Sequence, residues 1–161
     1  MNNFSKSSGV LIHITSLPGP YGIGEIGSQA KWFIDALAKM NQKYWQFLPT
    51  NYPENYNSPY DTNSAFAQNP LLIGLDDLID KSLIQKEDLK PVPNFSNTKV
   101  DFEKLIKWKM PILLKAVSAF LKSGDKELQK FEKFCFENSF WLEDYALFMV
   151  LKDINKNQSW A

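Results

Sequence analysis

The pattern of hydrophobic and polar residues predicts a strand, a helix and a second strand at the start of the chain. GVLIHIT, residues 9–15, is a short apolar run that ends in turn residues, as a buried strand does. Apolar residues then recur at helical spacing from Ser28, a predicted N-cap, to about Met40. YWQFLP, residues 44–49, is a second apolar run that a proline ends. This βαβ spacing predicts parallel strands with a right-handed crossover.

The periodic pattern stops after the second run. Residues 49–69 have neither a helical nor a strand period, and a loop of this length is uncommon in a compact domain unless it is functional or disordered. Its tyrosines and Phe66 argue against disorder. PLLIGLDDLI, residues 70–79, is expected to be a short strand or extended piece that enters a helical turn.

Two amphipathic helical patterns follow a linker rich in proline and lysine at residues 90–97. The first covers about residues 101–122 and contains Pro111, which is expected to interrupt or kink the helix. The second covers about residues 125–153, with a break near Asn138. Beyond the linker the pattern predicts no further strand.

This change of pattern divides the chain into an α/β portion, residues 1–80, which carries the loop at 49–69, and a helical subdomain, residues 81–161. The apolar content of 44% and the aromatic content of 14% predict an ordered globular protein. Its 18 basic residues are all lysine and balance 18 acidic residues, so no positive surface for nucleic acid is expected. We also expect no membrane partner and a cytoplasmic location, because no signal peptide or membrane-length apolar run is visible.

GIGEIG, residues 22–27, satisfies the glycine spacing of a dinucleotide-binding turn between a strand and a helix. Two features argue against that function. The residues SLPGPY separate the strand from the first of these glycines, and no acidic residue ends the second strand to bind a ribose. We therefore expect a structural loop in which the glycines allow close backbone packing.

His13, the single histidine, lies near the C-terminal end of the first predicted strand. It is either a core histidine that hydrogen-bonds to the backbone or a group that faces a site, since ligands bind at the C-terminal ends of parallel strands. A metal site is not expected, because the single Cys135 is far away in sequence and no carboxylate cluster accompanies either residue.

The loop at 49–69 carries aromatic rings, hydroxyls and amides close together. Sugars present an apolar C–H face and a rim of hydroxyls, so this composition suits a carbohydrate. Pro59 also holds Ser58 in an extended conformation ahead of Tyr60. The alternative is a packed Ω-loop whose aromatic residues cover the core.

Four blocks of sequence together resemble the bacterial 4-α-glucanotransferases, or amylomaltases, of glycoside hydrolase family 77. They are SGVLIHITSLPGPYGIGEIG, KYWQFLPT, NSPYDTNSAFAQNPLLI and WLEDYALFMVLK, in the order of the family. The resemblance implies an α/β fold of the TIM (β/α)8 barrel type. This chain would supply the first βαβ portion and an inserted helical subdomain, and the barrel would be incomplete in it.

The resemblance also implies a function. Members transfer an α-1,4-glucan segment to the 4-hydroxyl of an acceptor sugar by a retaining double displacement. They use an Asp nucleophile, a Glu acid/base and a second Asp, and they need no cofactor. These carboxylates lie beyond the matched part, so we expect no catalytic residue in this chain and no activity of the chain alone.

The resemblance assigns substrate contacts to the loop. Tyr60 matches the family tyrosine beside the sugar at the scissile bond, and Ser58 matches a serine on the acceptor side. Asn55 stands where the family has a tyrosine of a second glucan site, and Tyr56 stands where it has a glycine, so Tyr56 is a candidate to replace that tyrosine. Asn57 is expected to line the site, as is His13.

The expected partners are α-1,4-glucans and maltooligosaccharides. The main interpretation is that the chain is part of a working transferase. Two alternatives to it stay open at this point: a non-catalytic α-glucan-binding module that uses Tyr52, Tyr56 and Tyr60, and an inactive remnant. The oligomeric state is not predicted.

Overall fold

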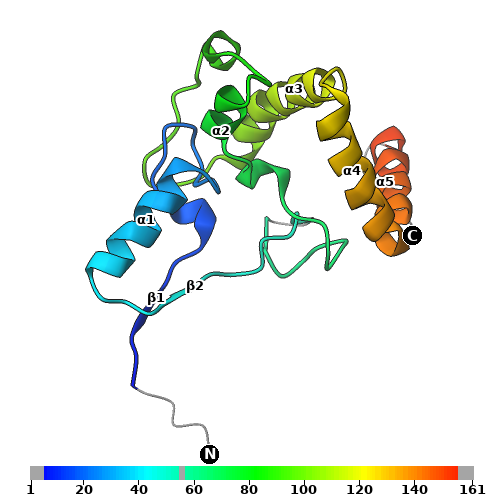
Figure 1. The fold of residues 1–161 in the computed structure, drawn as a ribbon. Helices are drawn as coiled ribbons and strands as arrows, with labels where there is room; N and C mark the ends of the chain where they lie inside the picture. The colour runs from blue at the N-terminus through cyan, green and yellow to red at the C-terminus, as the bar shows by residue number, and fades with distance from the viewer. Residues whose placement is uncertain (1–5, 55–56, 156–161) are drawn as a thin grey trace, which may run out of the picture.

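The computed structural model describes residues 6–54 and 57–155 of the chain (Figure 1). Strand β1 (Gly9–Leu11) and strand β2 (Tyr44–Gln46) form a parallel pair, and helix α1 (Ser28–Lys39) connects them. The predicted βαβ unit with parallel strands is therefore confirmed. The helix begins one residue earlier than predicted, because Gly27 and not Ser28 is its N-cap.

The first strand is shorter than the sequence pattern predicts. Pairing in β1 ends at Leu11, and residues Ile14–Ser16 form a 3₁₀ helix instead of the end of a strand. The backbone turns here because it packs against the GIGEIG loop, where the amide of Gly24 donates to the carbonyl of Thr15 (3.0 Å). The prediction of a strand as far as Thr15 was thus wrong, and a tertiary contact is the reason.

The GIGEIG glycines allow this close packing. A Cβ atom at Gly24 would lie 1.9 Å from the carbonyl oxygen of Ile14, and Gly22 has a φ of +77° with the ring of Phe95 against it. Both positions need glycine for local steric reasons. The expectation of a structural loop is confirmed.

Residues 70–80 also differ from the prediction. Pro70–Leu72 is a 3₁₀ helix capped by Asn69, whose side chain accepts from the amide of Leu71 (2.9 Å). Helix α2 (Leu75–Asp80) follows, and the extended character is limited to a parallel bridge between Ile26 and Ile73. A short 3₁₀ helix, Lys86–Leu89, then leads to the linker.

Helix α3 (Phe102–Phe120) is continuous across Pro111, so the predicted interruption is wrong. The proline lies on the exposed side, where water can satisfy the carbonyl of Lys107 that has lost its amide donor. Buried residues before and after the proline, such as Leu105 and Ile112, hold both halves of the helix on the core.

Helices α4 (Asp125–Glu137) and α5 (Ser139–Ile154) form a hairpin at the end of α3, and they separate at Asn138 as predicted. Figure 1 shows the two helices side by side, with the loop that follows β2 reaching toward them. Neither helix contains a fully buried residue within the described part of the chain. Among the described helices, none combines the length and the apolar content that a membrane crossing needs.

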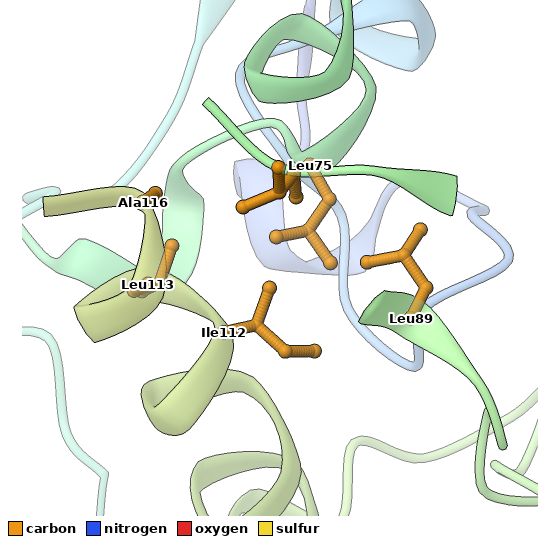
Figure 2. Close-up of a cluster of buried hydrophobic side chains, with 6 residues drawn as sticks. Leu75, Leu89, Ile112, Leu113 and Ala116 are labelled. Carbon is orange, nitrogen blue, oxygen red and sulfur yellow. The ribbon is translucent and has the colours of Figure 1, made fainter. Parts of the chain in front are cut away.

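The largest buried cluster connects α2, the following 3₁₀ helix and α3. Figure 2 shows Ile112 of α3 pointing toward Leu75 and Leu89. The cluster consists of Leu75, Ile84, Leu89, Ile112, Leu113 and Ala116. Because α2 and α3 share this core, α3 is firmly packed on the N-terminal part of the chain. The boundary between the α/β portion and the helical subdomain near residue 80 stays a prediction.

A buried ion pair also connects the two parts. The side chain of Lys109 on α3 is 0% exposed and its ammonium contacts Glu25 of the GIGEIG loop, which is 3% exposed. The same ammonium donates to the carbonyls of Leu71 (2.7 Å) and Ile73 (2.8 Å), so its donors are fully used. Burial raises the pKa of Glu25 and lowers the pKa of Lys109, and their mutual attraction opposes both shifts.

The parallel pair is open at its edges. Among the described residues, no third strand pairs with β1 or β2. Large apolar side chains around this unit are exposed, including Leu11 (61%), Trp32 (62%) and Tyr44 (64%). An apolar surface of this kind is usually covered by other protein.

Candidate functional site

A cavity of about 270 Å³ lies at the C-terminal ends of β1 and β2. His13 and Thr15 come from the segment after β1, and Asn51 comes from the segment after β2. Asn57 enters from the long loop and Phe102 from the first turn of α3. The C-terminal edge of parallel strands is where α/β proteins bind ligands, so the position of this cavity fits a binding site.

His13 is brought into this cavity by the early end of β1. Its Nδ1 atom is buried and has no hydrogen-bond partner among the described residues. Burial lowers the pKa of His13, which favours the neutral imidazole at pH 7. Of the two roles considered from the sequence, the position therefore favours the one that faces a site.

The loop after β2 is more ordered than its sequence pattern suggests. It doubles back on itself through antiparallel bridges between Asn51 and Gln68 and between Pro53 and Thr62. The side-chain amide of Asn51 donates to two backbone carbonyls of the returning segment, at 3.1 Å each. The loop is thus a narrow hairpin-like excursion.

The tip of the loop is a turn that carries two of the predicted substrate contacts, Ser58 and Tyr60. The amide of Asp61 donates to the carbonyl of Ser58 (3.1 Å), which closes a turn with Pro59 at its second position. Ser58 is half-buried and its hydroxyl lies 3.4 Å from the amide of Tyr60. The side chain of Tyr60 is 73% exposed, so its ring face is free to stack on a ligand.

The predicted site residues therefore fall into two neighbouring groups. His13 and Asn57 line the cavity, whereas Ser58 and Tyr60 sit on the adjacent turn. Asn57 adopts a positive φ of 55°, a conformation that asparagine tolerates, and this directs the chain into the turn. Asn55 and Tyr56 lie outside the described residues.

A wider groove of about 880 Å³ continues from the cavity toward the linker before α3. The two share Thr15, Asn57 and Phe102, and the groove adds side chains such as Ser96 and Thr98. The cavity is lined mainly by amides, hydroxyls and apolar side chains, whereas the groove adds the charged side chains of Lys99, Asp101 and Glu103. Amides and hydroxyls suit a hydroxyl-rich ligand.

Sequence reasoning missed several contributors to the site, among them Thr15, Asn51, Asn69 and Phe102. Phe102 comes from the helical part, and no local pattern connects it with the loop. Asn69 also lines the cavity, and the Asn-Pro pair before an apolar run was a signal for its capping role.

The carboxylates near the site belong to the groove, where Asp101 and Glu103 are among the lining residues. No Asp or Glu is among the residues that line the 270 Å³ cavity. The described residues also contain no cluster of three or more His, Cys, Asp or Glu side chains that is arranged to hold a metal ion. The amides and hydroxyls of the cavity can bind and orient a ligand.

A βαβ unit with an amide- and hydroxyl-lined cavity at the C-terminal ends of its strands defines an α/β protein of the ligand-binding class. Comparison with known proteins gives the family. Residues 12–161 match the 4-alpha-glucanotransferase family, glycoside hydrolase family 77, and the chain belongs to it.

The relatives agree with this assignment. The 4-alpha-glucanotransferase of Streptococcus pneumoniae serotype 4 is 42% identical over 157 residues, which cover 97% of this chain and 31% of the relative. The Thermus thermophilus 4-alpha-glucanotransferase is 41% identical, with 96% and 30% covered. The amylomaltase from Streptococcus agalactiae, solved in complex with acarbose, superposes with a TM-score of 0.91 at 38% identity and covers 96% of this chain and 31% of its own. The chain thus spans about 31% of the length of these proteins.

Proposed function

We propose that this chain forms the first βαβ unit of the (β/α)8 barrel of a 4-α-glucanotransferase, with an inserted helical subdomain from about residue 81. The observation that carries the proposal is the cavity at the C-terminal ends of β1 and β2, in a chain that superposes on an amylomaltase with a TM-score of 0.91. In barrels of this type the substrate binds at that edge of the strands.

The chemistry of the cavity supports α-glucans as its ligands. Amide and hydroxyl groups such as Asn51, Asn57 and Thr15 can exchange hydrogen bonds with sugar hydroxyls. The exposed ring of Tyr60 offers an apolar face to a pyranose ring, and the neutral His13 can accept or donate one further bond. The family membership favours this role over an independent glucan-binding module or an inactive remnant.

The division of roles follows from the reaction. A retaining transfer needs a nucleophile and an acid/base whose carboxyl groups are about 5–5.5 Å apart. No such pair lines the 270 Å³ cavity, so we assign both groups to the rest of the family fold. The residues of this chain would bind and orient the sugars, with Tyr60 beside the scissile bond and Ser58 on the acceptor side. The Tyr60 ring would also help to exclude water from the intermediate, which favours transfer over hydrolysis.

A chimaera tests the proposal. Residues 1–161 would replace the corresponding part of the Streptococcus agalactiae amylomaltase, and transfer would be followed as glucose release from maltotriose. We expect activity in the chimaera and none in residues 1–161 alone. If a sugar buries about 80 Å² of the Tyr60 ring, Tyr60→Ala removes about 2 kcal/mol, or about 30-fold in kcat/KM.

Two outcomes would contradict the proposal. One is a folded chimaera that is inactive, and the other is a chimaera whose activity Tyr60→Ala leaves unchanged. Tyr60→Phe is the matched control, since it keeps the exposed ring and removes only the hydroxyl, so it should retain most of the activity. Saturable maltooligosaccharide binding by residues 1–161 alone, followed by Trp fluorescence, would favour the glucan-binding module instead.

A further inference from the structure

The turn that carries Tyr60 has a narrow base, and that base is where its orientation is set. The last pairing before the turn is the bridge between Pro53 and Thr62. Glu54 and Asn63 directly follow these two residues, and the amide of Glu54 donates to the carbonyl of Asp61 (2.8 Å). Any group that holds Glu54 and Asn63 therefore holds both sides of the turn.

Helix α5 holds both residues through one lysine. The ammonium of Lys152 forms an ion pair with the carboxylate of Glu54. With its side-chain amide turned so that nitrogen faces Glu54, Asn63 donates to that carboxylate and accepts from Lys152 Nζ (3.2 Å). The lysine, the glutamate and the asparagine form a closed polar cluster, which we call the clamp.

The clamp is not an ordinary surface ion pair. The side chain of Lys152 is only 12% exposed and that of Glu54 is 33% exposed. For comparison, the lysine of the Lys130–Glu127 pair on α4 is 63% exposed. A lysine that has lost most of its water needs its partners, so the geometry of the clamp is more strongly determined than that of an exposed pair.

A second, apolar contact fixes the loop at the other end of α5. The ring of Phe66 stacks on Trp141 (centroids 5.6 Å apart, planes 22° apart) and meets the edge of Phe140 (5.4 Å, 87°). Trp141 and Lys152 are separated by about 16 Å along the helix. Contacts at two separated points prevent the loop from rotating about either one.

We propose that α5 positions the Tyr60-bearing turn, and that Lys152 is the positioning residue of this device. The consequence for sugar transfer rests on the proposed function, whereas the mechanical role does not. Lys152 touches no substrate in this scheme; it acts through Glu54 and Asn63.

Amide hydrogen exchange on the whole chain tests the mechanical role. In Lys152→Met the amides of Glu54 and Asp61 should exchange about tenfold faster, the result of losing a partly buried charged hydrogen bond. The amide of Leu105, which donates to Asp101 at the start of α3 (2.9 Å), should be unchanged. Lys130→Met, which breaks the exposed pair on α4, should leave the loop amides as they are.

A charge swap separates positioning from a general loss of stability. Glu54→Lys combined with Lys152→Glu restores the ion pair in the opposite sense, and the Asn63 amide can turn over to serve both groups. We expect the slow exchange of the Glu54-position and Asp61 amides to return in the double variant. Either single swap should release the turn.

Three results would overturn the inference. They are unchanged loop exchange in Lys152→Met, faster exchange in α5 with the loop unchanged, and no recovery in the swap. In the chimaera, Lys152→Met should raise KM for maltotriose more than it lowers kcat, and the swap should reverse this effect. Loss of loop protection without any chimaera activity would refute the proposed function but leave the positioning role intact.

Discussion

Replacement of Lys109 by methionine tests the most buried charge of the fold. Methionine has similar length and shape but no charge, so Lys109→Met removes the ammonium and leaves the packing on α3 largely in place. Glu25 then loses its charged partner at a position where its side chain is 3% exposed and keeps only the amide of Leu75 (3.2 Å). The carbonyls of Leu71 and Ile73 lose a donor as well.

The expected cost is large. Removing one partner of a buried ion pair typically costs about 3–5 kcal/mol, because the other charge is left uncompensated. The two carbonyls add unsatisfied acceptors at about 1–3 kcal/mol each, but these effects overlap and do not simply add. We therefore expect a loss of about 4 kcal/mol, a substantial part of the roughly 5–15 kcal/mol by which a domain is stable.

Urea unfolding followed by Trp fluorescence measures the change. Lys107→Met is the matched control, since Lys107 lies on the same helix but its pair with Glu103 is 74% and 79% exposed. That control should lose less than about 0.5 kcal/mol. Combining Glu25→Gln with Lys109→Met should recover about 2 kcal/mol, because the buried charge is gone and the acceptor for Leu75 remains.

The pH dependence adds a second criterion. Without Lys109, the folded-state pKa of Glu25 should rise further above its ordinary value of 4.5. The folded state then binds a proton that the unfolded state has released, so Lys109→Met should be least destabilising below pH 4.5 and most destabilising at neutral pH. A loss below about 1 kcal/mol at pH 7, or a double variant no more stable than the single one, would refute the reasoning.

Two further predictions concern the segment beside the groove. Gly24→Ala should destabilise the chain by about 1–3 kcal/mol, because the new Cβ would overlap the backbone of Ile14. Gly124→Ala is the control; it has open space around it and should change stability by less than about 1 kcal/mol. Equal effects of the two substitutions in urea unfolding would contradict the packing argument. Burial depresses the folded pKa of His13, so its contribution to stability is fully present above pH 6.5 and is lost as the pH falls below that value. His13→Asn should therefore flatten the decline of the melting temperature below pH 6.5, and an unchanged decline would show that His13 is not responsible.

Local patterns predicted the elements whose residues form one face of a strand or helix. The parallel strands with α1 between them, the two later helical regions and the break at Asn138 all follow from periodicity and turn residues within each segment. The loop chemistry at Ser58 and Tyr60 was also visible, because residue types alone indicate what kind of ligand they suit. Even Lys109 had a signal, since helical spacing places it on the same face as Leu105 and Ile112.

What the sequence by itself determined is the βαβ unit, the helical pattern after the linker at residues 90–97 and the resemblance that led to the family. Only the tertiary structure decided that β1 ends at Leu11, that α3 continues across Pro111, and that His13 faces a cavity with Phe102. The physical reason is that these features depend on contacts between residues far apart in the chain. The carbonyl of Thr15 finds its donor in the GIGEIG loop, and Glu54 finds its lysine on α5, and neither partner is encoded in the local pattern around the residue it holds.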